Sequence, residues 1–154
     1  IYYKMDCQEP DEIICQLKEC TKKTKKFTLD GCVKICKVVD VYDGDSCRVV
    51  FNHNGQINKW NIRMNGYDSP EMRPSKSLPN RDEIKAKAKA SKAYLKSLIC
   101  KDDQQLVFLK CGEFDKYGRL LGTIYVNQTD EKSVNDLMIE NGYAYEYHGG
   151  TKKN

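Results

Sequence analysis

The residues best suited to chemistry fall into three short clusters of acidic and basic side chains. These are Asp43-Gly44-Asp45, Asp68-Ser69-Pro70-Glu71 and Asp115-Lys116-Tyr117-Gly118-Arg119. Each cluster alone has an ordinary explanation, because Asp-Gly forms turns and an Asp followed three residues later by Glu can cap a helix. Together they contain what phosphodiester hydrolysis requires: oxygen ligands for a cation, a carboxylate that activates water, and cationic donors for the phosphate.

The acidic residues of the first two clusters suggest a metal site and a base. Asp45 and Asp68 supply two carboxylates, and the backbone carbonyl of Ser69 supplies a third oxygen. Such a set suits a hard cation, Ca²⁺ or Mg²⁺, which completes its coordination with water and substrate. Glu71, turned by Pro70, is the candidate general base.

Two arginines, Arg63 and Arg119, are candidates for binding the phosphate, because a guanidinium offers a planar fork of donors that matches phosphate oxygens. Side chains alternate along a strand, so Arg63 lies on the face opposite Ile62 and Met64. If those two apolar residues face the core, Arg63 can face a site.

The elements that must position these residues begin with three strands. β-Branched residues predict strands over 32–42 and 47–51, and Asn54-Gly55 predicts a hairpin into a third strand over 57–64. Three prolines then predict a loop over 66–80, because proline disrupts both helices and central strands.

The second half alternates between helices and strands. A helix is predicted from Asn80, with Asn80 as its cap and Glu83 at the third helical position, and strands are predicted over 105–110 and 120–126. A capping box from Ser133 to Asp136 predicts a short helix that buries Val134, Leu137 and Met138 and ends at Gly142. The alternating Tyr143, Tyr145 and Tyr147 predict a last short strand.

This order predicts a β-rich α+β fold built on a five-stranded Greek-key barrel, the OB-fold, with flanking helices. Residues 31–148 form the expected barrel domain, and 149–154 form a tail. Residues 1–30 form an appendage, to which the sequence assigns no clear structure.

Composition limits the class of protein. The chain has 154 residues, 40% of them apolar, with ten Tyr, which excludes a disordered chain, and the lack of a run near ~18 apolar residues excludes a membrane span. The net charge of +4 hides a basic segment over 72–101, with nine Lys and Arg against two acids. Such a segment suits a polyanion such as DNA or RNA, although a Lys-rich helix face is more often simply solvated.

The eight cysteines give no disulfide pattern. On one strand, Cys32 and Cys36 would lie about 13 Å apart, too far to pair. We expect reduced thiols, which favours an intracellular setting, with secretion as the alternative. A zinc or disulfide role for Cys7, Cys15 and Cys20 in binding a protein partner is a separate hypothesis.

Four motifs in order resemble staphylococcal nuclease and its thermonuclease-like family, over about residues 33–147. They are Asp43-Gly44-Asp45-Ser46, Ile62-Arg63 leading to Tyr67-Asp68-Ser69-Pro70-Glu71, the run from Phe114 to Leu120, and Val134-Asn135 to Asn141-Gly142. The resemblance implies an OB-fold nuclease that uses Ca²⁺ and a glutamate-activated water to cut DNA and RNA with little base specificity, leaving 3′-phosphate ends. The alternative is a non-catalytic OB-fold module that binds single-stranded nucleic acid.

The resemblance also assigns roles by motif. It implies that Asp45, Asp68 and Ser69 are calcium ligands, Asp43 their acidic neighbour, Glu71 the general base, Arg63 and Arg119 the catalytic arginines, and Lys116 and Tyr117 the residues that hold a terminal phosphate. The stretch around His148 departs from the family's second tyrosine pair, which puts base stacking there in question.

Overall fold

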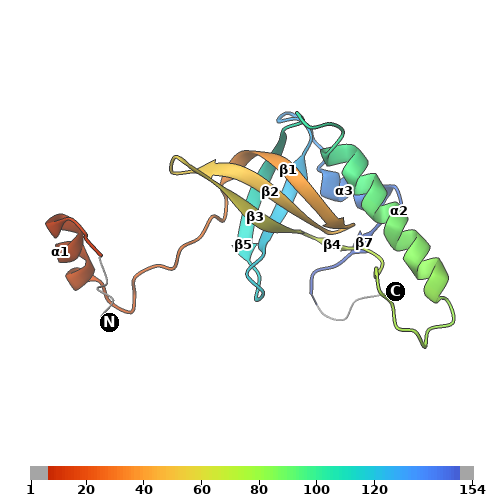
Figure 1. Ribbon diagram of the computed structural model, residues 1–154, viewed down its shortest axis with the longest axis horizontal. Helices are drawn as coiled ribbons and strands as arrows, with labels where there is room; N and C mark the ends of the chain where they lie inside the picture. Colours follow the sequence, from red (N-terminus) through yellow and green to blue (C-terminus); the bar gives the residue numbers. More distant parts are fainter. Residues whose placement is uncertain (1–6, 150–154) are drawn as a thin grey trace, which may run out of the picture.

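The computed structural model describes residues 7–149, and its centre is a closed five-stranded barrel (Figure 1). Strands β1 (Val33–Asp43), β2 (Ser46–His53) and β3 (Gln56–Met64) form an antiparallel meander. Positive φ angles of 53° at Asn54 and 83° at Gly55 make the tight turn between β2 and β3. The predicted meander and its hairpin are therefore confirmed.

Two later strands close the barrel. Strand β5 (Val107–Phe114) pairs antiparallel with β1 and with β6 (Leu120–Tyr125), and β6 pairs parallel with β3. The spatial order is β1-β2-β3-β6-β5, and a core that includes Val49, Ile62, Leu109 and Ile124 fills the interior. The predicted β-rich OB-fold barrel is confirmed.

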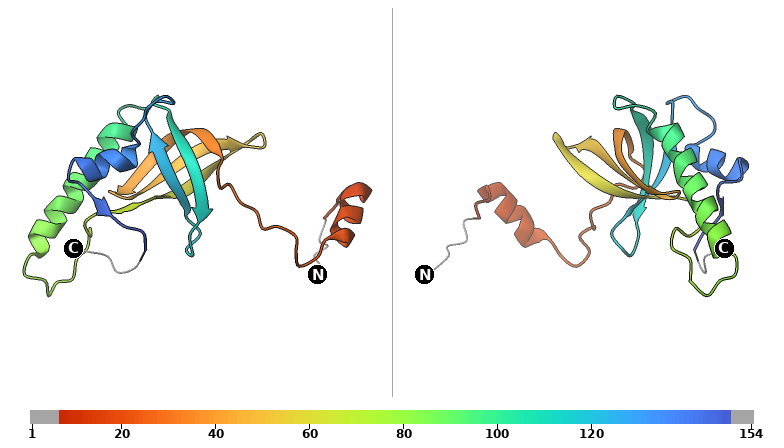
Figure 2. Two further views of the ribbon diagram at one scale, coloured as in Figure 1. Left: turned by 180° about the vertical axis from the view of Figure 1, so that it is seen from behind. Right: turned by 45° about the vertical axis from the view of Figure 1, so that its right-hand side comes forward.

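Helices flank the barrel at one end. Helices α2 (Arg81–Ile99) and α3 (Val134–Glu140) lie together there, whereas α1 (Asp11–Glu19) stands away from the strands and buries none of its residues (Figures 1 and 2). Between positions 7 and 149, no helix has the length and apolar character that a membrane crossing requires. The expected appendage and tail include residues 1–6 and 150–154, which lie outside the described residues.

A short second sheet lies beside the barrel. Strand β4 (Tyr67–Asp68) pairs antiparallel with β7 (Tyr145–Glu146), with Asp68 opposite Tyr145. Sequence patterns predicted β7 but missed β4, which falls within the expected proline-rich loop. Two residues are too few to show an alternating pattern, so only the pairing with β7 defines β4.

Two details of the helices differ from the prediction. Helix α2 begins after Asn80 as expected, but the Asn80 side chain makes no capping hydrogen bond, because the backbone there is not extended (φ −101°, ψ 24°). Helix α3 has the predicted capping box from Ser133 to Asp136, yet it buries Asn135 rather than Leu137, which is half-buried. Asn135 is buried because its side chain bonds three backbone groups.

All eight cysteines lie within the described part of the chain and are free thiols. Cys36, Cys47 and Cys111 are buried, whereas Cys7, Cys15 and Cys20 are exposed on and around α1. Burial, followed by a charge effect from Cys32, raises the pKa of Cys111 to about 11.

Candidate active site

The first acidic cluster forms the turn between β1 and β2. An irregularity in the pairing between Val41 and Asp43 bends β1 just before the turn, and the backbone N–H of Asp45 donates to Asp43 Oδ1 at 3.0 Å. Gly44 is required because a Cβ there would lie 2.8 Å from the Cβ of Ser69 and would also collide with Ser91. The turn is therefore held close to both α2 and the segment after β4.

The second acidic cluster meets the first turn in the fold. Asp45 and Asp68 are 4% and 3% exposed, although they lie 23 positions apart in the sequence. Ser69 joins them: its backbone N–H and hydroxyl donate to Asp45 Oδ2 at 3.1 and 2.9 Å, and its N–H also contacts Asp68 Oδ1 at 3.1 Å. We call Asp45, Asp68 and Ser69 the carboxylate cluster.

Arg63 lies against the carboxylate cluster from β3. Its Nη2 is 3.2 Å from Asp68 Oδ1, its Nη1 is 3.7 Å from Asp45 Oδ2, and Nη1 also donates to the backbone oxygen of Met64 at 3.1 Å. Its side chain is 12% exposed. Ile62 and Met64 are buried in the core, so the predicted alternation along this strand is confirmed.

Two tyrosines support the same cluster. Tyr67 is fully buried and donates from its hydroxyl to the backbone oxygen of Gly44 at 2.7 Å, which ties β4 to the first turn. Burial, aided by the charge of Asp45, raises the pKa of Tyr67 well above its usual value. Burial, with the charges of Asp68 and Asp45, raises the pKa of Tyr145 to about 12, so both hydroxyls stay protonated at neutral pH.

The donor types in the carboxylate cluster fit a hard cation. Two carboxylates and a backbone carbonyl are the oxygen ligands that Ca²⁺ and Mg²⁺ accept, with waters completing the shell. Within residues 7–149 there is no group of three or more His, Cys, Asp or Glu side chains that could hold a metal. Asp45, Asp68 and the Ser69 carbonyl would hold such an ion together with water or substrate oxygens.

The third cluster is the turn between β5 and β6, and Asp115 organises it. Asp115 Oδ1 accepts the backbone N–H groups of Tyr117 and Arg119 at 2.9 Å each, and its Oδ2 accepts Arg119 Nε at 2.8 Å. Burial alone would raise the pKa of Asp115, but these hydrogen bonds outweigh it and leave the pKa lowered. Arg119 is thereby fixed, with its guanidinium 5.4 Å from the centre of the Tyr117 ring.

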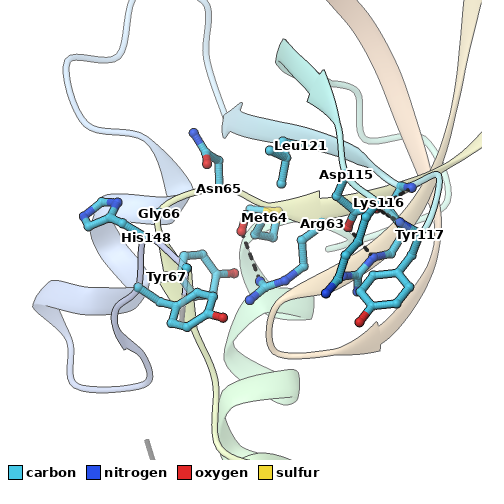
Figure 3. Close-up of a pocket in the computed structure, with 13 residues that line it drawn as sticks. Arg63, Met64, Asn65, Gly66, Tyr67, Asp115, Lys116, Tyr117, Leu121 and His148 are labelled. Carbon is cyan, nitrogen blue, oxygen red and sulfur yellow. Dashed lines mark hydrogen bonds and ion pairs between the residues drawn. The ribbon is translucent and has the colours of Figure 1, made fainter. Parts of the chain in front are cut away.

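A hollow of about 370 Å³ connects this turn with Arg63, and we call it the Tyr117 hollow. Figure 3 shows Arg63 between Lys116 and Tyr117 on one side and Tyr67 and His148 on the other. Tyr117 is 72% exposed, and Lys116 Nζ lies 5.1 Å from the centre of its ring. The lining therefore combines cations with aromatic rings, a combination that suits nucleotides.

Glu71 lies outside the Tyr117 hollow, two residues after Ser69 on the far side of Pro70. It is half-buried, and its Oε1 accepts the backbone N–H of Arg73 at 3.3 Å. The structure therefore brings Asp45, Asp68, Ser69 and Arg63 into one cluster and groups Arg119, Lys116 and Tyr117 in the adjoining hollow.

Sequence reasoning missed some residues of the site. Tyr147 and His148 line the Tyr117 hollow, although the sequence offered no secure partner for a second tyrosine there. The alternation of Tyr143, Tyr145 and Tyr147 was the available signal. The supporting role of Asn135 was also missed: its Nδ2 donates to the backbone oxygens of Asn65 and Gly122 at 2.8 and 3.1 Å, and its Oδ1 accepts the N–H of Ile124 at 3.0 Å.

Comparisons with known proteins agree with this architecture. Residues 61–154 match the family model described as staphylococcal nuclease homologue. Endonuclease YncB of Bacillus subtilis (strain 168) is 31% identical over 134 residues, which cover 85% of this chain and 54% of YncB. The SPbeta prophage-derived endonuclease YokF of the same organism is 32% identical over 113 residues, 71% of this chain and 34% of YokF. The chain thus spans about half the length of YncB and a third of YokF. It belongs to the staphylococcal nuclease family.

Proposed function

We propose that this protein is a calcium-dependent nuclease that hydrolyses DNA and RNA with little base specificity and leaves 3′-phosphate ends. The observation that carries the proposal is the burial of Asp45 and Asp68 around Arg63, at the edge of a hollow lined by cations and aromatic rings. Membership of the staphylococcal nuclease family supports it, as do the two relatives named as endonucleases.

Asp45, Asp68 and the Ser69 carbonyl would hold the cation. When bound, Ca²⁺ supplies positive charge that neutralises a phosphate oxygen and favours ionisation of a nearby water. Asp43 acts indirectly, because its carboxylate holds the backbone of Asp45 in the turn.

The protein's own residues handle the water and the phosphate. Glu71 accepts a proton from the attacking water, whose oxygen forms a new bond to phosphorus. The bond from phosphorus to the 5′ oxygen breaks, and that oxygen leaves as a 5′-hydroxyl after taking up a proton. Arg63 and Arg119 neutralise the charge that develops on the phosphate, while Lys116 and Tyr117 hold a neighbouring phosphate group.

The test is hydrolysis of a fluorescent single-stranded DNA in millimolar Ca²⁺ and in EGTA, followed by end-group analysis of the products. We expect cleavage only with Ca²⁺, for RNA as well as DNA. Glu71→Gln should lower the rate by about 10²–10⁴-fold and leave binding intact, because it removes the proton acceptor. Glu131→Gln, an exposed change of the same type, should leave the rate unchanged.

Salt-sensitive binding without cleavage, unaffected by EGTA, would instead establish the non-catalytic OB-fold module and refute the nuclease proposal. Equal rates for Glu71→Gln and the wild type would remove Glu71 from the mechanism.

A further inference from the structure

A second hollow, of about 430 Å³, lies beside the carboxylate cluster and shares no lining residue with the Tyr117 hollow. Its walls come from the loop after β4, from α2 and from the segment that leads into β7. We call it the Tyr143 hollow, and the lining residues that matter here are Pro70, Lys87, Ala90, Tyr143, Ala144 and Tyr145.

This hollow borders the carboxylate cluster directly. Pro70 follows Ser69 and precedes Glu71 in the chain, and Tyr145 pairs with Asp68 across the β4–β7 sheet. The Tyr117 hollow borders the same cluster through Arg63, whose guanidinium lies 3.2 Å from Asp68. The candidate reaction centre therefore lies between two hollows that approach it through different residues.

The walls of the Tyr143 hollow suit a flat aromatic ligand. The ring of Tyr143 is stacked on Tyr94, with centroids 4.2 Å apart and planes 21° apart. The Tyr94 hydroxyl in turn accepts a hydrogen bond from Asn141 at 2.8 Å. A ring held in this way is a firm platform for stacking, and Pro70 and Ala90 add apolar surface.

A lysine side chain, Lys87, places a positive charge on the wall of this hollow. Lys87 Nζ is 3.2 Å from Glu83, but both side chains are about two-thirds exposed, at 65% and 64%. An exposed pair of this kind is weak, so Lys87 can turn to a phosphate at little cost. Lys87 also belongs to the basic segment over 72–101, and no residue of that segment lines the Tyr117 hollow.

We propose that the Tyr143 hollow binds the nucleotide on the 5′ side of the scissile phosphate, with its base against Tyr143 and Pro70 and the preceding phosphate near Lys87. This inference rests on the proposed nuclease function, because a phosphodiester joins two nucleotides and the Tyr117 hollow takes one of them.

The direction of the strand follows from in-line displacement. The leaving oxygen departs on the side of phosphorus opposite the attacking water. Glu71, which activates that water, adjoins Pro70 on the wall of the Tyr143 hollow. The departing nucleoside therefore lies in the Tyr117 hollow, and the nucleotide that keeps the phosphate lies in the Tyr143 hollow.

The test compares two dinucleotides in millimolar Ca²⁺: dithymidine monophosphate, and the same molecule with an abasic unit on its 5′ side. For the wild type, loss of the 5′ base should lower kcat/KM about tenfold, the effect expected for one stacked base. Ala90→Phe should abolish this difference, because the added ring fills the hollow from an exposed helix position. Ala86→Phe, an exposed change on the same helix outside the lining, should keep the tenfold difference.

Lys87 is tested with a dinucleotide that carries an additional 5′-phosphate. Lys87→Ala should cancel the gain in kcat/KM that this phosphate gives the wild type. Lys89→Ala, the same change on the opposite face of α2, should preserve that gain. The inference is overturned if loss of the 5′ base leaves the kcat/KM of the wild type unchanged. It is also overturned if that loss changes kcat/KM by the same factor in Ala90→Phe and Ala86→Phe.

Failure of the nuclease proposal gives a different result. If the wild type cleaves neither the dinucleotides nor the fluorescent single-stranded DNA in Ca²⁺, the proposed function is refuted. Whenever the dinucleotides are not cleaved, the same comparisons are made by measuring the Kd of each dinucleotide in competition with a fluorescent oligonucleotide. A tenfold weaker Kd for the abasic dinucleotide that disappears only in Ala90→Phe would still establish the hollow as a nucleotide site. A Kd independent of the 5′ base would refute the inference.

Discussion

Replacing Arg63 by Met should destabilise the protein far more than the same change at Arg48, although Arg48 makes the shorter ion pair. Arg48 lies 2.8 Å from Asp40, but these side chains are 43% and 49% exposed. Arg63 lies 3.2 Å from Asp68, and these side chains are 12% and 5% exposed. Solvent screens the first pair, whereas breaking the second removes a positive charge from beside two buried carboxylates.

The expected magnitudes follow from that burial. Arg63→Met loses contacts with two buried carboxylates and a hydrogen bond to the Met64 carbonyl, a loss of about 3–5 kcal/mol in the free energy of unfolding. Arg48→Met should lose about 0–1 kcal/mol. Urea unfolding in EGTA, followed by fluorescence of the single tryptophan, Trp60, measures both changes.

Calcium gives this experiment a second readout. If Asp45 and Asp68 hold the ion, Arg63→Met should bind Ca²⁺ more tightly than the wild type, because a competing positive charge has been removed. Millimolar Ca²⁺ should then narrow the stability gap between the two proteins. Equal losses for Arg63→Met and Arg48→Met would refute the argument from burial, and a gap unchanged by Ca²⁺ would refute the expected competition between Arg63 and the ion.

Three further predictions concern other parts of the structure. Asn135→Ala should cost about 3 kcal/mol in urea unfolding, since three buried hydrogen bonds are lost, whereas an effect below about 1 kcal/mol would show that water replaces them. Asp115→Asn should destabilise the protein at pH 7, and the gap should close as the pH falls below about 3.8, because the lowered pKa of Asp115 stabilises the fold only while it is ionised; a gap independent of pH would contradict this. In thiol labelling at pH 8, Cys15 should react well before Cys111, whose pKa is about 11, and equal rates would contradict the burial of Cys111.

The sequence predicted the parts of the fold that local patterns determine. The strands β1 to β3 follow from β-branched residues and from Asn54-Gly55, and the capping box of α3 was found from four residues. The position of Arg63 opposite Ile62 and Met64 followed from strand alternation alone.

Features that depend on distant partners could not be predicted in this way. The β4–β7 pair has two residues in each strand, and only the closed fold brings Asp68 opposite Tyr145. The sequence predicted burial of Leu137 and not of Asn135, because apolar side chains usually occupy buried helix positions. Asn135 is buried because it forms hydrogen bonds with backbone groups of β6 and of the residue after β3, which are distant in the sequence.

The parallel pairing of β3 with β6 has a consequence for folding. Arg63 on β3 is opposite Leu121 on β6, two residues from Arg119, and the chain between them includes α2 and β5. A contact between residues so distant in sequence carries a large loop-closure entropy, which slows its formation. The two arginines therefore come to line the same hollow only when the barrel closes. A chain still emerging from the ribosome, with β1 to β3 already paired, has Arg63 but not yet the hollow that Arg63 lines together with Arg119.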